Sequence, residues 1–166
     1  SNLFIATTTP LRLTDVNLDW SGFAGNTYAA GTNAWVQIGG TLTNHKTLNW
    51  INGVVHQYQL NNNLVVTSNA TLTLADGVVL RSDAYNWDVL VDGRMEGTNA
   101  SVELLNSVHW GDYSSVDVRP GGSLSLTGGR LWGYGVVYVQ TNATANLTNV
   151  SCQDYYGSPG WVQYQA

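Results

Sequence analysis

A recurring unit of short strands constrains the fold of this chain more than any other feature. The segment LFIATTTPLRLTDVNL (3–18) aligns without a gap with VYVQTNATANLTNVSC (137–152). In both, apolar and polar residues alternate in short runs that small or polar residues interrupt, a pattern typical of half-buried strands. No long stretch keeps a period of 3.6 residues, so the sequence predicts little or no helix.

The last apolar position of one strand type recurs along the whole chain. Its separations are 33, 28, 25, 27, 21 and 25 residues, and its members are Ile5, Ile38, Val66, Val91, Val118, Val139 and Tyr164. A small-residue turn then leads to a second strand, and six positions on lie the inward residues Leu11, Leu72, Leu124 and Ala145. After Val91 about five extra residues predict a loop that bulges from this corner. A third short strand follows in most units.

Irregular units of this length cannot bury their apolar face alone and must stack. The chain is therefore predicted to be all-β, a right-handed parallel β-helix (β-solenoid) of about six coils, in one domain covering residues 1–166. The left-handed type needs strict six-residue repeats, which this sequence lacks, so the right-handed type is predicted. An antiparallel sandwich or jelly roll also has many short strands, but it does not predict an ungapped match between units.

Two segments, GGTLTN (39–44) and NATLTLADGV (69–78), carry a resemblance to a known family. They are similar to coils of bacterial surface adhesins and autotransporter passengers, and the chain as a whole resembles the pectin-lyase-like superfamily of right-handed β-helices. The resemblance covers nearly the whole chain and rests on architectural motifs. It implies the fold, whereas a fold alone does not assign a function.

Charged residues are sparse in this sequence. They make up 10% of the chain, the net charge is −5 and no Lys/Arg cluster is present, so no nucleic-acid partner is expected. No apolar run approaches the roughly 18 residues of a membrane helix, so no membrane insertion is expected. Cys152 has no metal-ligand spacing around it and is predicted to be a buried apolar residue. Neither a metal nor another cofactor is expected.

Both ends of the predicted solenoid fall at the same strand type, which would leave rungs with unpaired backbone groups. The rung residues are Leu3, Ile5, Val162 and Tyr164. We expect the C-terminal rung of one copy to meet the N-terminal rung of the next in a head-to-tail homopolymer. A start at Ser1 instead of Met fits a processed extracellular or cell-surface protein, and equally a fragment of a longer solenoid. The expected function is a noncatalytic structural subunit of a surface fibre or adhesin.

Aromatic residues recur at fixed places and suggest a first alternative. One tyrosine is predicted in the corner before the first strand of each coil, in the series Tyr28, Tyr58, Tyr85, Tyr113, Tyr134 and Tyr156. If it points outward, the ladder of Tyr85, Tyr113, Tyr134 and Tyr156 would form a platform for a surface polysaccharide. Four tryptophans are predicted at one position that closes the third strand, with core or corner packing as the main interpretation: Trp20, Trp50, Trp110 and Trp132. A carbohydrate-binding module is therefore an alternative function.

Five glycosylation sequons begin at Asn69, Asn99, Asn142, Asn146 and Asn149. The first three are predicted in the corner after the first strand of their coils. A glycan needs such an exposed turn, but asparagine also suits the turn without a sugar.

A polysaccharide lyase or glycosidase is a further alternative. Asp83, Asp112 and Asp154 fall near the tyrosine corner of successive coils and form the one acidic group that the repeat suggests. Catalysis by a carboxylate pair would need two of them to face each other across a groove. Turn aspartates that bond their own backbone explain the same pattern, so catalysis is not expected.

Overall fold

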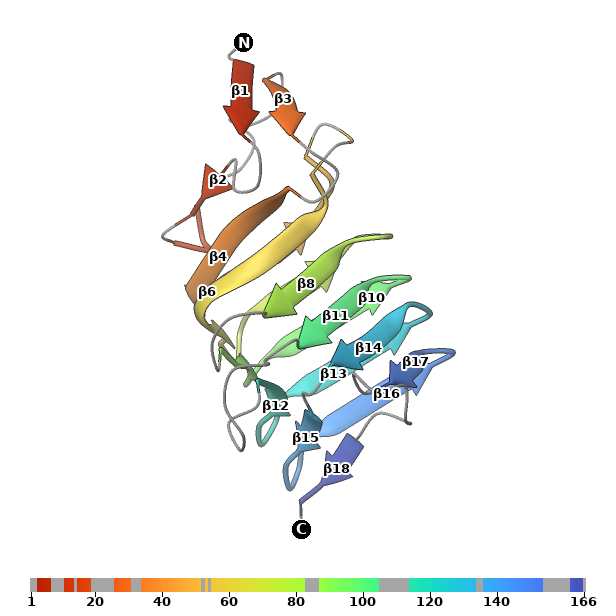
Figure 1. Cartoon of the computed structure of the whole chain (residues 1–166). Coiled ribbons are helices and arrows are strands. Elements are labelled where there is room, and N and C mark those ends of the chain that lie inside the picture. Colours follow the sequence, from red (N-terminus) through yellow and green to blue (C-terminus); the bar gives the residue numbers. More distant parts are fainter. Residues whose placement is uncertain are drawn as a thin grey trace.

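The computed structural model describes residues 3–6, 11–13, 15–18, 26–30, 34–51, 53, 55–82, 87–104, 114–133, 136–153 and 162–165. These residues form eighteen β-strands and no helix. Accordingly, no helix that could span a membrane occurs among them. The strands stack into an elongated body, with the N- and C-termini at opposite ends (Figure 1).

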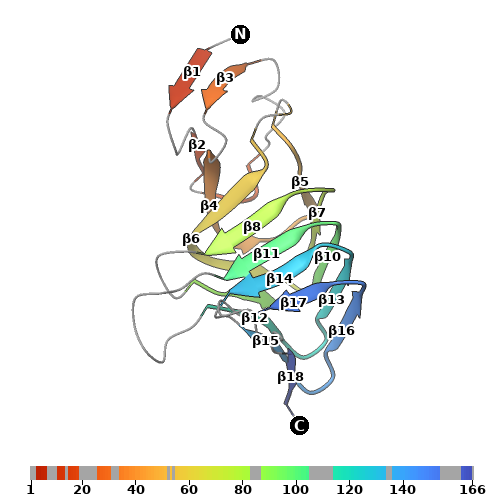
Figure 2. The ribbon, with the colours of Figure 1, turned by 45° about the vertical axis from the view of Figure 1, so that its right-hand side comes forward.

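The body is a parallel β-solenoid with three faces (Figures 1 and 2). The first face contains β9 (Val89–Val91), β12 (Ser115–Val118), β15 (Val136–Val139) and β18 (Val162–Tyr164). The second face contains β5 (Lys46–Leu48), β7 (Thr71–Leu74), β10 (Arg94–Thr98), β13 (Ser123–Thr127) and β16 (Thr144–Thr148). The third face contains β8 (Val79–Ser82), β11 (Ser101–Leu104), β14 (Arg130–Gly133) and β17 (Ser151–Gln153).

Two long strands, β4 (Trp35–Leu42) and β6 (Gln57–Val66), belong to both the third and the first face. The start of β6 pairs with β8 and its end pairs with β9. Strand β4 passes from the third face to the first face at two glycines, Gly39 and Gly40. A Cβ atom on Gly39 would lie 2.7 Å from Asn61 Oδ1, and Gly40 has a φ of 96°, in the left-handed region that favours glycine. Glycine therefore lets β4 bend closely over β6.

Three short strands lie at the N-terminal end of the solenoid. Strand β2 (Leu11–Arg12) pairs with β4, whereas β1 (Leu3–Ala6) and β3 (Thr27–Ala30) form a separate two-stranded parallel sheet. Figures 1 and 2 both show this sheet beyond the main stack.

The predicted β-solenoid is confirmed, and much of its register is confirmed as well. One ladder of the first face joins Val66, Val91, Val118, Val139 and Tyr164. One ladder of the second face joins Leu72, Met95, Leu124 and Ala145. The handedness of the coiling stays a prediction.

The predicted register is wrong in the first part of the chain. Ile38 pairs with Leu60 on the third face, and Leu42 instead pairs with Val66. Ile5 pairs with Ala29 in the separate sheet, and Leu11 pairs with Val36. The reason is that the corner inside β4 does not interrupt the alternation of apolar residues. The second face consequently has five strands, and the solenoid has about five coils instead of six.

The loop predicted after Val91 is also absent. Strand β10 begins at Arg94, and Met95 is the buried inward residue of this coil. The corner is short because Gly93 packs directly on the preceding coil. A Cβ atom on Gly93 would lie 2.1 Å from the carbonyl oxygen of Thr67. A tight corner therefore replaces the predicted loop.

Inward side chains of the stacked coils form one apolar core. Leu72, Leu80, Met95, Val116 and Leu124 are among its fully enclosed members. The corners between the second and third faces allow this stacking because they contain residues with positive φ, namely Gly77, Asn99, Gly128 and Asn149. Glycine and asparagine tolerate this conformation better than other residues do.

Tyr58, predicted in a corner before a first strand, lies instead within β6 and is the largest fully buried side chain of the described residues. It makes the stability of the core sensitive to high pH. Its hydroxyl donates a hydrogen bond to the Asn49 carbonyl, and burial raises the pKa of Tyr58 above its ordinary value of 10.0. In the unfolded chain the phenol ionises near pH 10, so the stabilising difference is present below pH 10 and is lost as the pH rises further.

We expect the free energy of unfolding to fall more steeply above pH 10 in the wild-type protein than in Tyr58→Phe. The variant loses one hydrogen bond, worth about 1 kcal/mol, at every pH. Urea denaturation between pH 8 and pH 11 measures both effects. Equal slopes above pH 10 in the two proteins would contradict the prediction.

Candidate functional site

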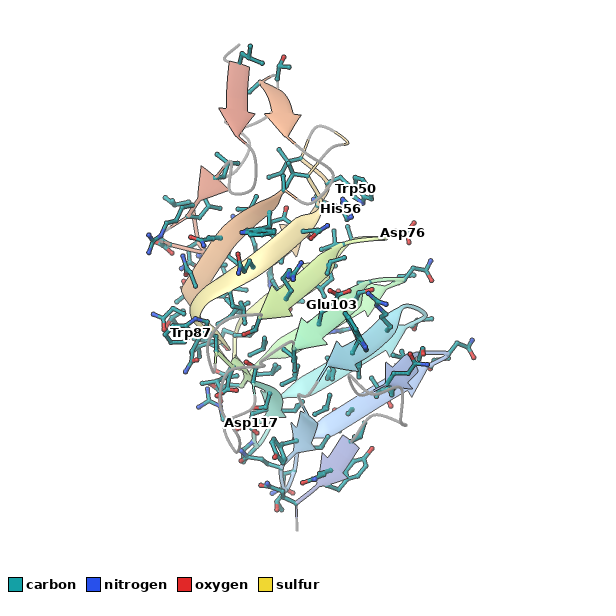
Figure 3. All side chains as sticks on the ribbon, in the orientation of Figure 1. Trp50, His56, Asp76, Trp87, Glu103 and Asp117 are labelled. Carbon is teal, nitrogen blue, oxygen red and sulfur yellow. The ribbon has the colours of Figure 1, made fainter. Side chains whose placement is uncertain are left out.

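The outward side of the third face carries a row of aromatic and charged side chains. We name it the third-face belt and define it by Trp35, Arg81, Glu103, Arg130 and Trp132. Strand pairing places Arg81, Glu103 and Trp132 directly beside one another on β8, β11 and β14. Glu103 lies on the front of this face in Figure 3. The regular register of the coils therefore collects these side chains into one line along the solenoid axis.

Side chains of the third-face belt hold one another in place. The Arg81 guanidinium carbon lies 5.4 Å from the centre of the Trp35 ring, and the Arg130 carbon lies 4.8 Å from the centre of the Trp132 ring. Both distances are within the range of cation–π attraction. Arg130 also forms an ion pair with Glu103, whose side chain is only 9% exposed. This pairing offsets the cost of burying the carboxylate.

Backbone groups of the belt strands are already paired. Strand β8 pairs with β6 and β11, strand β11 with β8 and β14, and strand β14 with β11 and β17. A ligand on this face would therefore meet side chains and no open strand edge.

The C-terminal coil forms a second candidate site, which we name the C-terminal rung: β16, β17 and β18. Within the described part of the chain, each of these strands pairs with a single neighbour. The inward residues Ala145, Leu147, Cys152 and Val162 pack against the core but are only partly buried. Tyr164 is 72% exposed. Partial burial raises the pKa of the Cys152 thiol, which therefore behaves as an apolar group at neutral pH.

A polar hollow of about 450 Å³ lies on the second face, lined by side chains that include Thr73, Asp76, Glu96 and Ser125. Glu96 accepts a hydrogen bond from Thr73 at 3.1 Å and forms an ion pair with Arg94 at 2.7 Å. Its carboxylate is thus held by its own neighbours on the sheet.

Trp50 and Trp132, the two described members of the predicted tryptophan series, do not share a position. Trp132 lies on the third face, whereas Trp50 follows β5 of the second face. Trp50 is 44% exposed, stacks on His56 with ring centres 4.1 Å apart and donates a hydrogen bond to the Asp76 carbonyl (Figure 3). Packing at a corner is confirmed for Trp50, and neither ring belongs to the core.

Several predicted residues lie outside the described part of the chain. They are the aromatic residues Tyr85, Tyr113, Tyr134, Tyr156, Trp20 and Trp110, and the acidic residues Asp83, Asp112 and Asp154. The predicted stacking residues are placed in part. Leu3 is 61% exposed on β1, Ile5 lies in the same strand and Val162 is half-buried.

All five sequon asparagines are exposed: Asn69, Asn99, Asn142, Asn146 and Asn149. Asn69 and Asn142 lie in the corner after the first face, as predicted. The same prediction is wrong for Asn99, which follows β10 and lies in the corner between the second and third faces. The reason is again the short corner at Gly93, which places this sequon one strand later.

Sequence reasoning missed the third-face belt. Its signal is present in the segments VLRS, SVEL and RLWG, where Arg81, Glu103 and Trp132 occupy the same place relative to the buried residue before them. Recognising that signal requires the register between coils, because no spacing within one coil joins these residues.

The described residues contain no group of three or more His, Cys, Asp or Glu side chains that could hold a metal ion. Comparison of the chain with models of protein families, with curated proteins and with solved structures gives no match.

Proposed function

We propose that this chain is a noncatalytic extracellular structural protein whose β-solenoid subunits stack end to end into a surface fibre or adhesin. The proposal includes right-handed coiling and a relation to the adhesin coils of the pectin-lyase-like superfamily. It also includes a location at the cell surface and N-linked glycans on the exposed sequons.

One observation carries the proposal: the described strands of the C-terminal rung have none of the charged or proline residues that normally protect an edge. Its strands read TANLT, SCQ and VQY, without a charged residue or a proline. Natural edge strands are usually kept apart by charges, prolines or bulges. Strand β1, with the sequence LFIA, is likewise uncharged. A second copy stacked on the C-terminal rung would pair its backbone groups and cover its partly buried apolar residues.

Leu147→Lys tests the proposed stacking. Leu147 is an inward residue of the C-terminal rung, so stacking a second coil on it would bury the new ammonium group at a high cost in free energy. We expect wild-type protein to form fibres as its concentration rises and Leu147→Lys to stay monomeric, as measured by light scattering and negative-stain imaging. Thr127→Lys is the matched control, because Thr127 is exposed and lies on β13, which is paired on both sides by β10 and β16.

The control should assemble like the wild-type protein. The proposal fails if Leu147→Lys assembles as well as Thr127→Lys does. It also fails if wild-type protein stays a monomer of 18.0 kDa at every concentration.

A further inference from the structure

We propose that the third-face belt is a binding site for a linear polysaccharide. The inference concerns a face different from the C-terminal rung and does not depend on stacking.

The shape of the belt indicates an extended ligand. Its side chains come from β4, β8, β11 and β14, and β6 lies between β4 and β8 on the third face. With about 4.8 Å between neighbouring strands, four steps span roughly 19 Å. A chain of sugar rings that lies along the solenoid axis would meet a new row of side chains at each coil.

The chemistry of the belt suits sugars. Trp35 and Trp132 are half-buried, and the part of each ring that its arginine leaves uncovered could contact the C–H faces of sugar rings. Arg130 is 49% exposed on its side chain, which leaves donor groups for hydroxyl oxygens. Ligand sites commonly combine aromatic surface with a few well-positioned polar groups. The ion pair and the cation–π contacts fix those groups before any ligand arrives.

Other classes of ligand fit less well. A peptide that adds a strand needs an open sheet edge, and the belt strands are paired on both sides. A nucleic acid needs a basic surface, whereas the protein has a net charge of −5 and Glu103 lies in the middle of the belt. A glycosidase needs two carboxylates, and Glu103 is the one carboxylate among the described outward residues of the third face. The inference is therefore restricted to binding.

Titration of the full chain with linear oligosaccharides tests the site. One arm uses neutral glucan chains and the other uses oligouronides, with affinity measured by calorimetry at low and high salt. We expect Trp132→Ala to weaken binding at least about tenfold, as for a central aromatic contact. Trp132→Phe should restore most of the affinity, because it restores a ring at this position.

Tyr138→Ala is the matched control, because Tyr138 is an aromatic residue of β15 on the first face, beside Asp117. It should bind like the wild-type protein, and circular dichroism should show the same β-structure in all variants. Binding of either class of sugar with loss in Trp132→Ala supports the site. Failure of both classes to bind, or equal affinities for Trp132→Ala and Tyr138→Ala, would overturn it.

Discussion

Gly129→Ala is expected to lower the melting temperature by about 6–12 °C or more, or to prevent folding. A Cβ atom at this position would lie 1.9 Å from the carbonyl oxygen of Ala100 in the preceding coil, and the φ of Gly129 is 74°. Coils cannot move apart at this corner without breaking the hydrogen bond from Arg130 N to Ala100 O, 3.2 Å long. A cost of at least about 3 kcal/mol follows from such overpacking, and each kcal/mol corresponds to about 2–4 °C for a chain of this size.

Gly121→Ala separates this clash from backbone strain alone. Gly121 also has a positive φ, 85°, but a Cβ atom there would meet nothing within 4 Å. We expect a cost of about 1–2 kcal/mol, which is the ordinary cost of a left-handed conformation. Thermal unfolding followed by circular dichroism compares the two variants. Equal melting temperatures would contradict the close stacking of coils at Gly129.

Leu124→Ala is expected to destabilise the protein by about 3 kcal/mol, because it leaves a cavity in a tightly packed core. Leu124 lies between Met95 and Ala145 in the inward ladder of the second face and is 1% exposed. Urea denaturation measures the change in the free energy of unfolding.

Leu147→Ala is the matched substitution in the C-terminal rung. The side chain of Leu147 is only partly buried, so its loss should cost roughly half as much in dilute, monomeric protein. Under conditions that favour fibres, stacking would complete the burial of Leu147, and the cost should approach that of Leu124→Ala. Equal costs for the two variants in dilute protein would contradict the partial exposure of the C-terminal rung.

Sequence reasoning predicted the solenoid and the register of its first face from Val66 onward, because most coils there keep their first and second strands separated by a recognisable turn. The predicted register was wrong where a corner of the solenoid does not interrupt the alternation of apolar and polar residues. The two glycines of β4 turn a corner inside an unbroken alternation, and Gly93 shortens a corner that looked like a longer loop. Both failures come from close contacts between coils, which a single sequence does not display.

The two candidate sites also differ in how far the sequence alone predicts them. The C-terminal rung could be predicted, since Val162 and Tyr164 continue the apolar positions of earlier coils. The third-face belt could not, because Arg81, Glu103 and Trp132 have different chemistry and come from coils of different length. Only the pairing of β8, β11 and β14 brings them together.

The axial repeat of the assembled protein tests the proposed stacking most directly. Imaging of concentrated wild-type protein should show uniform fibres that repeat every subunit, at no less than roughly 24 Å, the length of about five coils spaced about 4.8 Å apart. That repeat would mean that the strands of one copy continue the ladders of the next. Monomers of 18.0 kDa at every concentration, or irregular aggregates without an axial repeat, would contradict the account.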